Sequence, residues 1–192
     1  MQPLMNTTVL MSGAEYFDDG QAINPFMGGT KDVDISVATA EHALLKRTLE
    51  SLGVTVITTP APLDLQDGVY TANWALVRRD KAVLSSLPPS RQGEQPYAEQ
   101  ALAKLGKTTY TVPAGLKFSG QGDALPCGNY LFCGSGYRTD MAVHGFLAET
   151  LGYDVISLQT IPQLDARGAP MVNAISGWAD SYFYDLDLAL AV

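Results

Sequence analysis

"HALLKRTLESLGVTVITT", residues 42–59, combines the pattern of a helix, a stop signal and the pattern of a strand. Leu45, Leu49 and Leu52 recur at helical spacing, so they fall on one face of the expected helix. Gly53 then permits the left-handed backbone conformation that commonly ends a helix. The β-branched run that follows is typical of a strand. This stretch therefore predicts a helix that ends at Leu-Gly and continues into a strand.

The same pattern occurs twice more along the chain. It returns as "YAEQALAKLGKTTYTVP" at residues 97–113 and as "MAVHGFLAETLGYDVISLQ" at residues 141–159. In both stretches a helical pattern again stops at Leu-Gly and a strand pattern follows. Such a period of roughly fifty residues indicates modules that surround an axis or stack in a row.

A β pair is expected after each of the first two strands. "YTANWALV" (70–77) leads across an Arg-Arg-Asp turn into "KAVLSSL" (81–87), and "DALP" (123–126) leads across Cys-Gly-Asn into "YLFCG" (130–134). The turn residues are those that favour tight reversals. The repeated unit is therefore a helix, a strand, a loop and a hairpin, which predicts an α/β fold.

Length and composition predict one domain over residues 1–192. The chain is 46% hydrophobic and 17% charged, as is ordinary for a soluble globular protein. It has no apolar run of membrane-spanning length, and its first residues lack the basic and apolar regions of a signal peptide. We therefore expect a cytoplasmic protein that does not bind membranes.

The net charge of −8 bears on the class of partner. Nucleic-acid binding depends on clustered Lys and Arg, so we expect no nucleic-acid partner. An acidic chain is compatible with a cationic small molecule. Neither the two cysteines nor the two histidines match the spacing of metal ligands, so neither a metal nor another cofactor is predicted.

The cysteine and histidine residues favour structural interpretations. Cys127 and Cys133 are expected to be free thiols rather than a disulfide, and Cys133 lies within an apolar run. His42 and His144 lie in the first and third helical patterns. A lone histidine on a helix is more often a packing partner than a catalyst.

Each repeat also carries an aspartate near its hairpin. These aspartates are Asp67, Asp123 and Asp187. The last lies in the C-terminal stretch "SYFYDLDLALAV" at residues 181–192, which the repeat predicts to open the hairpin of the third module. If the modules surround an axis, the three carboxylates converge on one central cleft. The alternative is that each caps a turn, as aspartate commonly does before a strand.

Six ordered motifs give the chain a family resemblance. It resembles the guanidino-group-modifying superfamily of amidinotransferases, arginine deiminases and dimethylarginine dimethylaminohydrolases. The motifs are "YFDDGQAINPFM" (16–27), "DGVYTANWALV" (67–77), "RQGE" (91–94), "FSGQGD" (118–123), "GYRTD" (136–140) and "FYDLDLAL" (183–190). The resemblance implies an α/β propeller of ββαβ modules, C-terminally truncated so that about three of its five modules are present.

The resemblance also implies a binding site for a guanidino compound. Asp67 matches the carboxylate that grips the guanidinium, and Asn73 stands where relatives have either a second acid or Asn. Arg91 and Arg138 match arginines that hold the substrate α-carboxylate. Asp187 matches the aspartate of the family's His-Leu-Asp motif.

Two further points belong to this implied site. Asp123 ends the glycine-rich motif "FSGQGD" and is expected to join the substrate-binding residues. For Arg91 and Arg138 an ion pair stays open as the alternative to substrate binding, because Glu94 and Asp140 lie nearby in the sequence.

The catalytic positions of the family differ in this chain. Ser119 stands where the family has its catalytic Glu, and Asp185 stands where it has the general acid/base His. The family's nucleophilic cysteine lies beyond residue 192, and neither Cys127 nor Cys133 matches its motif. The resemblance therefore implies a catalytically impaired homologue that binds an arginine-like molecule.

Two alternatives to that function stay open. The chain is a subunit of a guanidino-modifying hydrolase or transferase completed by another chain, or it is a structural or interaction module with a vestigial site. In each case a partial ring exposes strand edges and apolar module faces, which favour association. We therefore expect a homo-oligomer, most simply a symmetric dimer.

Overall fold

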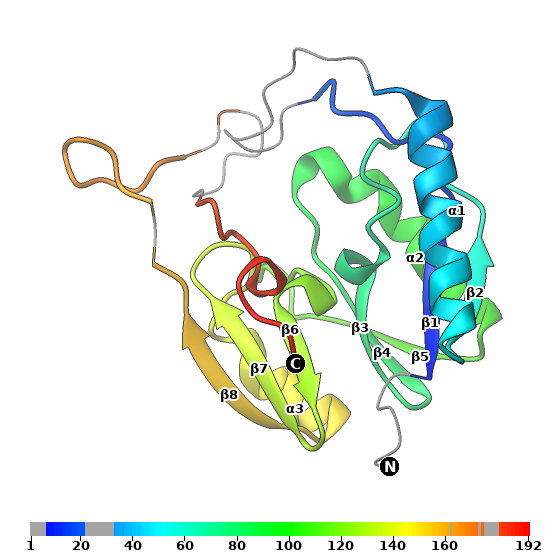
Figure 1. Cartoon of the computed structure of the whole chain (residues 1–192). Coiled ribbons are helices and arrows are strands. Elements are labelled where there is room, and N and C mark those ends of the chain that lie inside the picture. Colours follow the sequence, from blue (N-terminus) through cyan, green and yellow to red (C-terminus); the bar gives the residue numbers. More distant parts are fainter. Residues whose placement is uncertain (1–6, 22–32, 162, 173, 175–180) are drawn as a thin grey trace. The chain divides into compact units, whose positions relative to one another are not determined.

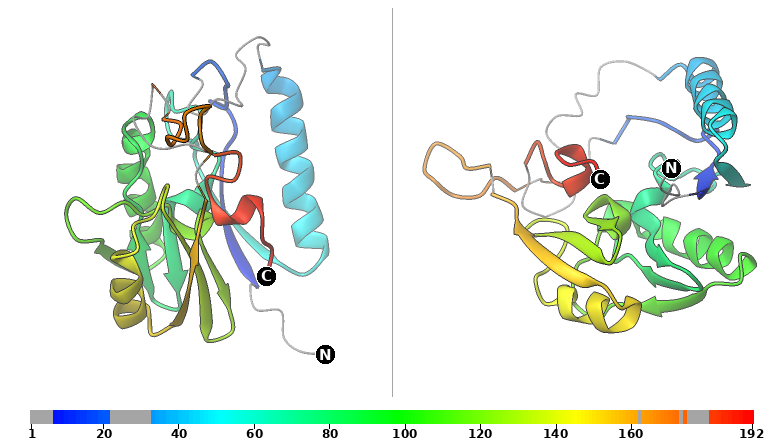
Figure 2. Two further views of the ribbon diagram at one scale, coloured as in Figure 1. Left: turned by 90° about the vertical axis from the view of Figure 1, so that its left-hand side faces the viewer. Right: turned by 60° about the horizontal axis from the view of Figure 1, so that its bottom comes forward.

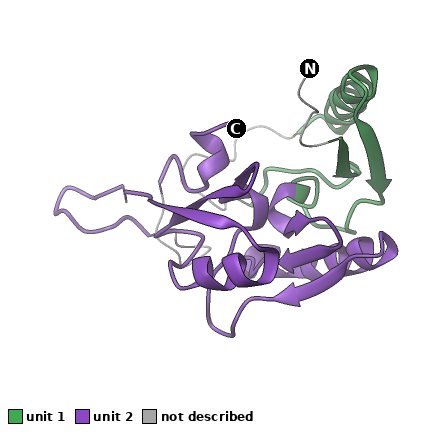
Figure 3. Ribbon diagram, turned by 90° about the horizontal axis from the view of Figure 1, so that it is seen from below, with its two compact units in different colours: residues 1–22, 28–71 green, residues 23–27, 72–192 purple. Residues whose placement is uncertain are grey.

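The computed structural model describes residues 7–21, 33–161, 163–172, 174 and 181–192. The chain divides into two compact units (Figure 3). Unit 1 comprises residues 1–22 and 28–71, and unit 2 comprises residues 23–27 and 72–192. Residues 22–27 of the motif at 16–27 lie outside the described residues.

Unit 1 contains one helix and a two-stranded sheet. Strands β1 (Thr8–Ser12) and β2 (Thr55–Thr59) pair in parallel, and helix α1 (Ile35–Ser51) connects them and runs alongside (Figures 1 and 2). The side chain of Asp34 accepts hydrogen bonds from the backbone N–H groups of Ser36 and Val37, which fixes where α1 begins. The sequence pattern did not predict β1.

Unit 2 contains two sheets of identical topology. In each, the first two strands form an antiparallel hairpin, and the third strand pairs in parallel with the second. A helix precedes each third strand, α2 (Gln95–Lys104) in the first case and α3 (Val143–Leu151) in the second (Figure 1). The strands are β3 (Ala75–Arg78), β4 (Lys81–Leu84), β5 (Thr108–Thr111), β6 (Ala124–Cys127), β7 (Tyr130–Ser135) and β8 (Asp154–Gln159).

The repeat predicted from the sequence is confirmed. All three helices end at Leu-Gly, where Gly53, Gly106 and Gly152 have φ of 82°, 70° and 71°. The hairpins turn at Arg79 and Gly128, which also have positive φ. The fold is therefore a mixed α/β arrangement with three sheets.

Two of the expected boundaries were wrong. Residues 71–74 of the predicted strand at 70–77 form a 3-10 helix, η1 (Thr71–Trp74), and the strand begins only at Ala75. The tail expected to open a further hairpin forms a short 3-10 helix, η4 (Leu186–Leu188). Two further 3-10 helices, η2 (Pro89–Glu94) and η3 (Gly120–Gly122), lie in unit 2.

The main core of unit 2 lies around α3. Val143 and Leu147 of this helix pack in one cluster with strand residues from both sheets, among them Leu76 and Val83 of the first. Cys133 belongs to the same cluster, and burial raises the pKa of its thiol. Both cysteines are free thiols, as expected. None of the helices in the described ranges is long and apolar enough to cross a bilayer.

His144 has the structural role that the sequence favoured. It is buried on α3, with Nδ1 2.7 Å from Ser157 Oγ on β8 and Nε2 2.9 Å from the backbone oxygen of Gly134 on β7. The imidazole therefore ties the helix to two strands of its own sheet.

Candidate functional site

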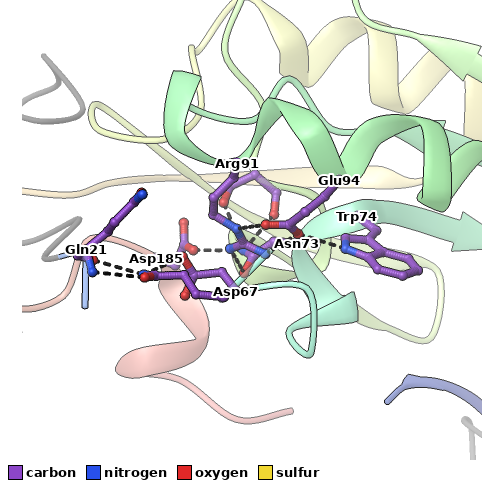
Figure 4. A network of polar contacts seen from close by, with 9 residues as sticks. Gln21, Asp67, Asn73, Trp74, Arg91, Glu94 and Asp185 are labelled. Atoms are coloured by element: carbon purple, nitrogen blue, oxygen red, sulfur yellow. Dashed lines mark hydrogen bonds and ion pairs between the residues drawn. The ribbon is translucent and has the colours of Figure 1, made fainter. Parts of the chain in front are cut away.

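The side chain of Asn73 connects three segments of unit 2 that lie far apart in the sequence. Its Nδ2 lies 2.9 Å from Asp185 Oδ2 and 3.0 Å from Ser119 Oγ, while its Oδ1 accepts a 2.9 Å bond from Arg91 Nη1 (Figure 4). The structure thus brings together four of the residues singled out in the sequence.

Arg91 and Glu94 form a buried, bidentate ion pair. Arg91 Nε lies 2.7 Å from Glu94 Oε1, and Arg91 Nη2 lies 2.8 Å from Glu94 Oε2. Glu94 Oε2 also accepts a 2.9 Å bond from the indole N–H of Trp74 (Figure 4). The ion-pair alternative for Arg91 is therefore realised, and its contact with a substrate carboxylate stays a prediction.

Three carboxylates gather at the other end of this network. Asp123 is buried at the start of β6, and its Oδ1 accepts a 3.2 Å bond from the backbone N–H of Leu186. This bond holds the tail residues Asp185 and Asp187 close enough to interact electrostatically with Asp123. No group of three metal-ligating side chains suited to a metal ion occurs among the described residues.

Burial makes these carboxylates unusually basic. It raises the pKa of Asp123 to about 7, and the charge of Asp185 adds to the shift. Burial and the same charge raise the pKa of Asp187 to about 6. Burial also raises the pKa of Asp185, against the opposing effects of Arg138 and of hydrogen bonds from Ser119 and Asn73.

Asp185 has one satisfied and one unsatisfied oxygen. Oδ2 accepts the hydrogen bond from Asn73, whereas Oδ1 is buried and has no hydrogen-bond partner among the described residues. A buried acceptor without a donor costs free energy, and native proteins rarely retain one. The carboxylate is therefore suited to receive an N–H group from a ligand.

Arg138 supplies a cation on the same side of the network. Its guanidinium carbon lies 4.8 Å from the ring centroid of Tyr184, within the range of a cation–π interaction. Asp140, the ion-pair candidate for Arg138, lies 3.7 Å from Lys117 Nζ and accepts a bond from the Lys117 backbone N–H. Burial raises the pKa of Tyr184 to about 12, so its phenol is neutral at physiological pH.

Glycine permits the close packing of this site. A Cβ at Gly122 would lie 2.9 Å from Asp185 Oδ2 and closer still to Asn73 Nδ2. A Cβ at Gly134 would overlap the carboxylate of Asp123. The glycine of the motif "FSGQGD" at position 122 therefore lets Asn73 and Asp185 meet across the backbone.

Asp67 belongs to unit 1 and is described within it. It is buried, and its Oδ2 accepts a 3.3 Å bond from Gln66 Nε2. Its role as a guanidinium ligand, and its convergence with Asp123 and Asp187, stay predictions.

Comparison with known proteins identifies the family. No family model matches the chain. It is 33% identical over 183 residues to the N(G),N(G)-dimethylarginine dimethylaminohydrolase of Mycobacterium tuberculosis, covering 95% of this chain and 54% of that protein. It is also 34% identical over 189 residues to the bifunctional arginine dihydrolase/ornithine cyclodeaminase AgrE of a Nostoc species, covering 90% of this chain and 26% of AgrE.

Solved structures agree with these matches. The crystal structure of the N-terminal domain of ArgZ bound to product, an arginine dihydrolase from cyanobacteria, superimposes with a TM-score of 0.79 at 31% identity. That match covers 94% of this chain and 60% of the ArgZ chain. The chain belongs to the guanidino-group-modifying superfamily. It spans about half the length of the dimethylaminohydrolase and about a quarter of AgrE.

Ser119 and Asp185 lie in one network, because both side chains accept a hydrogen bond from Asn73. That they stand at the positions of the family's catalytic Glu and His stays a prediction.

The sequence did not single out every residue of this candidate site. Trp74 and Tyr184 were missed, although each lies beside a residue that the sequence singled out, Asn73 and Asp185. The backbone N–H of Leu186 was also missed, because side-chain motifs carry no signal for a backbone donor.

Proposed function

We propose that this chain binds an arginine-like guanidino compound and does not turn it over. One observation carries the proposal: Asp185 Oδ1 is buried with no donor among the residues that the structure describes, beside two further carboxylates of raised pKa. A guanidinium group has five N–H donors in a planar fork that matches carboxylate oxygens. Such a ligand would satisfy Asp185 and offset the mutual repulsion of the three aspartates.

The loss of turnover follows from the chemistry of the side chains. Ser119 has a neutral hydroxyl where the family has an acid, and Asp185 has a carboxyl group held by Asn73 where the family has an imidazole. The thiol of Cys133 is buried in the core, and burial raises its pKa, so it is not a thiolate nucleophile.

The wider architecture is part of this proposal. The repeated ββαβ order supports an incomplete α/β propeller, in which residues 1–192 form one domain and the carboxylates line its centre. The similarity to metabolic enzymes of arginine supports a cytoplasmic location.

A second candidate function rests on the lengths of the relatives. This chain corresponds to 60% of the ArgZ N-terminal domain. A second polypeptide that supplies the remaining part, with a nucleophile and an acid/base group, would make the chain a subunit of a guanidino-modifying enzyme. Release of citrulline, ornithine or ammonia from arginine on addition of that part would favour this candidate.

Calorimetric titration tests the main proposal. Purified protein is titrated with arginine, methylated arginines, agmatine and creatine at pH 7.5, and each mixture is then assayed for citrulline, ornithine and ammonia. We expect saturable binding of at least one guanidino compound and no product. Absence of binding across the panel would refute the binding function, whereas product formation would refute the loss of turnover.

A further inference from the structure

Helix α3 shows how neighbouring modules of this chain pack. The helix contacts β8 of its own sheet and β4 of the preceding sheet. Its residues Val143 and Leu147 are fully buried in a cluster with Leu76 of β3 and Val83 of β4. Tyr110 and Val112, from the third strand of that preceding sheet and the residue after it, pack against the same cluster. One face of the β3–β4–β5 sheet therefore receives the helix of the next module.

Polar contacts add to this packing. Lys81 Nζ donates a 2.9 Å bond to the backbone oxygen of Thr150, and Arg78 Nη1 donates a 3.0 Å bond to that of Leu151. Cations at these positions satisfy carbonyl groups at the C-terminal end of α3. The module–module contact thus combines an apolar face with a capped helix end.

Helix α1 has the same kind of face, but it is exposed. The two helices can be aligned at the Leu-Gly pair that ends each of them. In this alignment the buried residues of α3 correspond to four residues of α1, here called the α1 face: Leu44, Leu45, Thr48 and Leu52. Leu44, Leu45 and Leu52 are 56%, 54% and 67% exposed. None of the residues of the described helix α1 is buried.

A depression of about 440 Å³ adjoins the α1 face at Leu44. Its other lining residues also come from α1 and are Ser36, Val37, Ala40, Glu41 and Arg47. Within unit 1, α1 lies beside β1 and β2 (Figure 2). The described strands of that sheet number two, whereas α2 and α3 accompany sheets of three. An exposed apolar surface of this kind is typical of an interaction site.

The last sheet of unit 2, β6–β7–β8, has an apolar strand face that is partly exposed. This face is identified by comparing strand register with the β3–β4–β5 sheet, whose contacts with α3 come from Leu76, Val83, Tyr110 and Val112. The four corresponding residues of the last sheet are here called the open sheet face. They are Leu125, Phe132, Ile156 and Leu158. All four are apolar; Ile156 is 38% exposed and the others are half-buried.

We propose that the chain associates head to tail with a second copy, so that the α1 face of one copy lies on the open sheet face of the other. This contact would continue the module–module interface that the chain already forms between α3 and the β3–β4–β5 sheet. Each copy carries both complementary faces. Such a contact is heterologous, and two copies either close a ring or extend as a chain.

The charged residues at this contact differ from those at the internal interface. Arg47 corresponds to Phe146 of α3, which packs against the core cluster, so Arg47 would lie at the edge of the new contact. Asp154 alternates along β8 with Ile156 and therefore shares its face. The positions of Arg78 and Lys81 are occupied by Cys127 and Tyr130, so the helix-capping cations of the internal interface are not repeated.

Light scattering coupled to size exclusion tests the association at 50–100 µM. We expect the wild-type protein to have at least twice the mass of one chain, and Leu44→Glu and Ile156→Glu each to reduce it to one chain mass. The control is Leu63→Glu, another leucine of unit 1 that is 58% exposed, and its mass should equal that of wild type. Circular dichroism confirms that each variant is folded.

Mixing the two variants distinguishes a head-to-tail contact from a symmetric one. A mixture of Leu44→Glu and Ile156→Glu retains one intact pair of faces, so it should form species of two chains and no larger. A wild-type protein that is monomeric throughout this range would overturn the proposal. Dimers that persist in both single variants, or that fail to reappear on mixing, would overturn it as well.

Discussion

The two ends of the network around Asn73 differ in how their charges are satisfied. At one end Arg91 and Glu94 neutralise each other through two short bonds, and Trp74 occupies a further lone pair of Glu94. At the other end Asp123, Asp185 and Asp187 accumulate negative charge, and their pKa values are raised.

This difference separates a structural role from the proposed binding role. Removing one partner of a buried ion pair is strongly destabilising, because it leaves the other charge buried and unpaired. Carboxylates held together with an unsatisfied oxygen store unfavourable free energy, which a cation can release on binding. Under the proposed function the same network therefore contains a fixed end, Arg91 with Glu94, and a receptive end, the three aspartates.

The largest effect is expected at the paired end. Glu94→Ala leaves the Arg91 guanidinium buried without its bidentate partner, which should lower the free energy of unfolding by about 3–5 kcal/mol. Urea denaturation measures this loss. Glu99→Ala, which removes an exposed carboxylate on α2, serves as the control and should change stability by less than about 0.5 kcal/mol. Equal losses of unfolding free energy in the two variants would show that the Arg91–Glu94 ion pair has no special structural role.

At the receptive end a substitution should affect binding rather than stability. Asp185→Asn keeps the shape but removes the charge, and we expect arginine affinity to fall about 10- to 100-fold. Stability at pH 8 should stay equal or rise, because a buried carboxylate of raised pKa no longer has to ionise. Calorimetry and thermal unfolding give the two readouts, with Glu99→Gln as control. Unchanged affinity would show that Asp185 does not hold the ligand.

The junction between the two ends depends on a glycine. Gly122→Ala would push Asn73 away from Asp185, and we expect a loss of about 1–3 kcal/mol in stability together with weaker arginine binding. Gly145→Ala on α3 is the matched control, because its Cβ would meet no atom within 4 Å. That change should stabilise the helix by up to about 1 kcal/mol. If both substitutions are neutral, the close approach at Gly122 has no energetic weight.

The carboxylates also give the stability a pH dependence. The folded-state pKa values of Asp123 (about 7) and Asp187 (about 6) lie above the ordinary value of 3.8, so the folded state binds more protons across that interval. The stability these groups contribute is present in full below about pH 4 and is lost as pH rises toward 7. The melting temperature should therefore fall between pH 5 and pH 8.

Asp123→Asn tests the origin of that trend. The variant should flatten the profile measured by scanning calorimetry, because the group with the pKa of about 7 no longer titrates. If the melting temperature of the variant falls with pH as steeply as that of wild type, other groups cause the pH dependence.

The sequence predicted the repeat because local signals determine it. Apolar spacing and the Leu-Gly stops fixed the helices, and turn residues such as Gly128 fixed the hairpins. Strand β1 was missed, since it follows no such helix and its partner β2 lies more than forty residues away. The strand boundary at residue 75 was also missed, because η1 is a tertiary feature in which the buried Trp74 donates to Glu94.

The site was predicted as a set of residues rather than as a geometry. The family motifs supplied Asn73, Ser119 and Asp185, but not their contact, which Gly122 permits by keeping the backbone free of a Cβ. The raised pKa values arise from burial and from charges brought close by folding, and no local pattern encodes either. The ion pair of Arg91 with Glu94 was visible as an alternative, since its three-residue spacing is local.

The central claim is that a guanidinium cation binds at the receptive end of this network. Calorimetric titration of arginine at pH 6.5, in two buffers of different ionisation enthalpy, measures binding and proton exchange together. A cation there favours the ionised carboxylates, so we predict saturable binding with proton release, reduced in Asp185→Asn. Absence of binding, or binding without any exchange of protons, would contradict the claim.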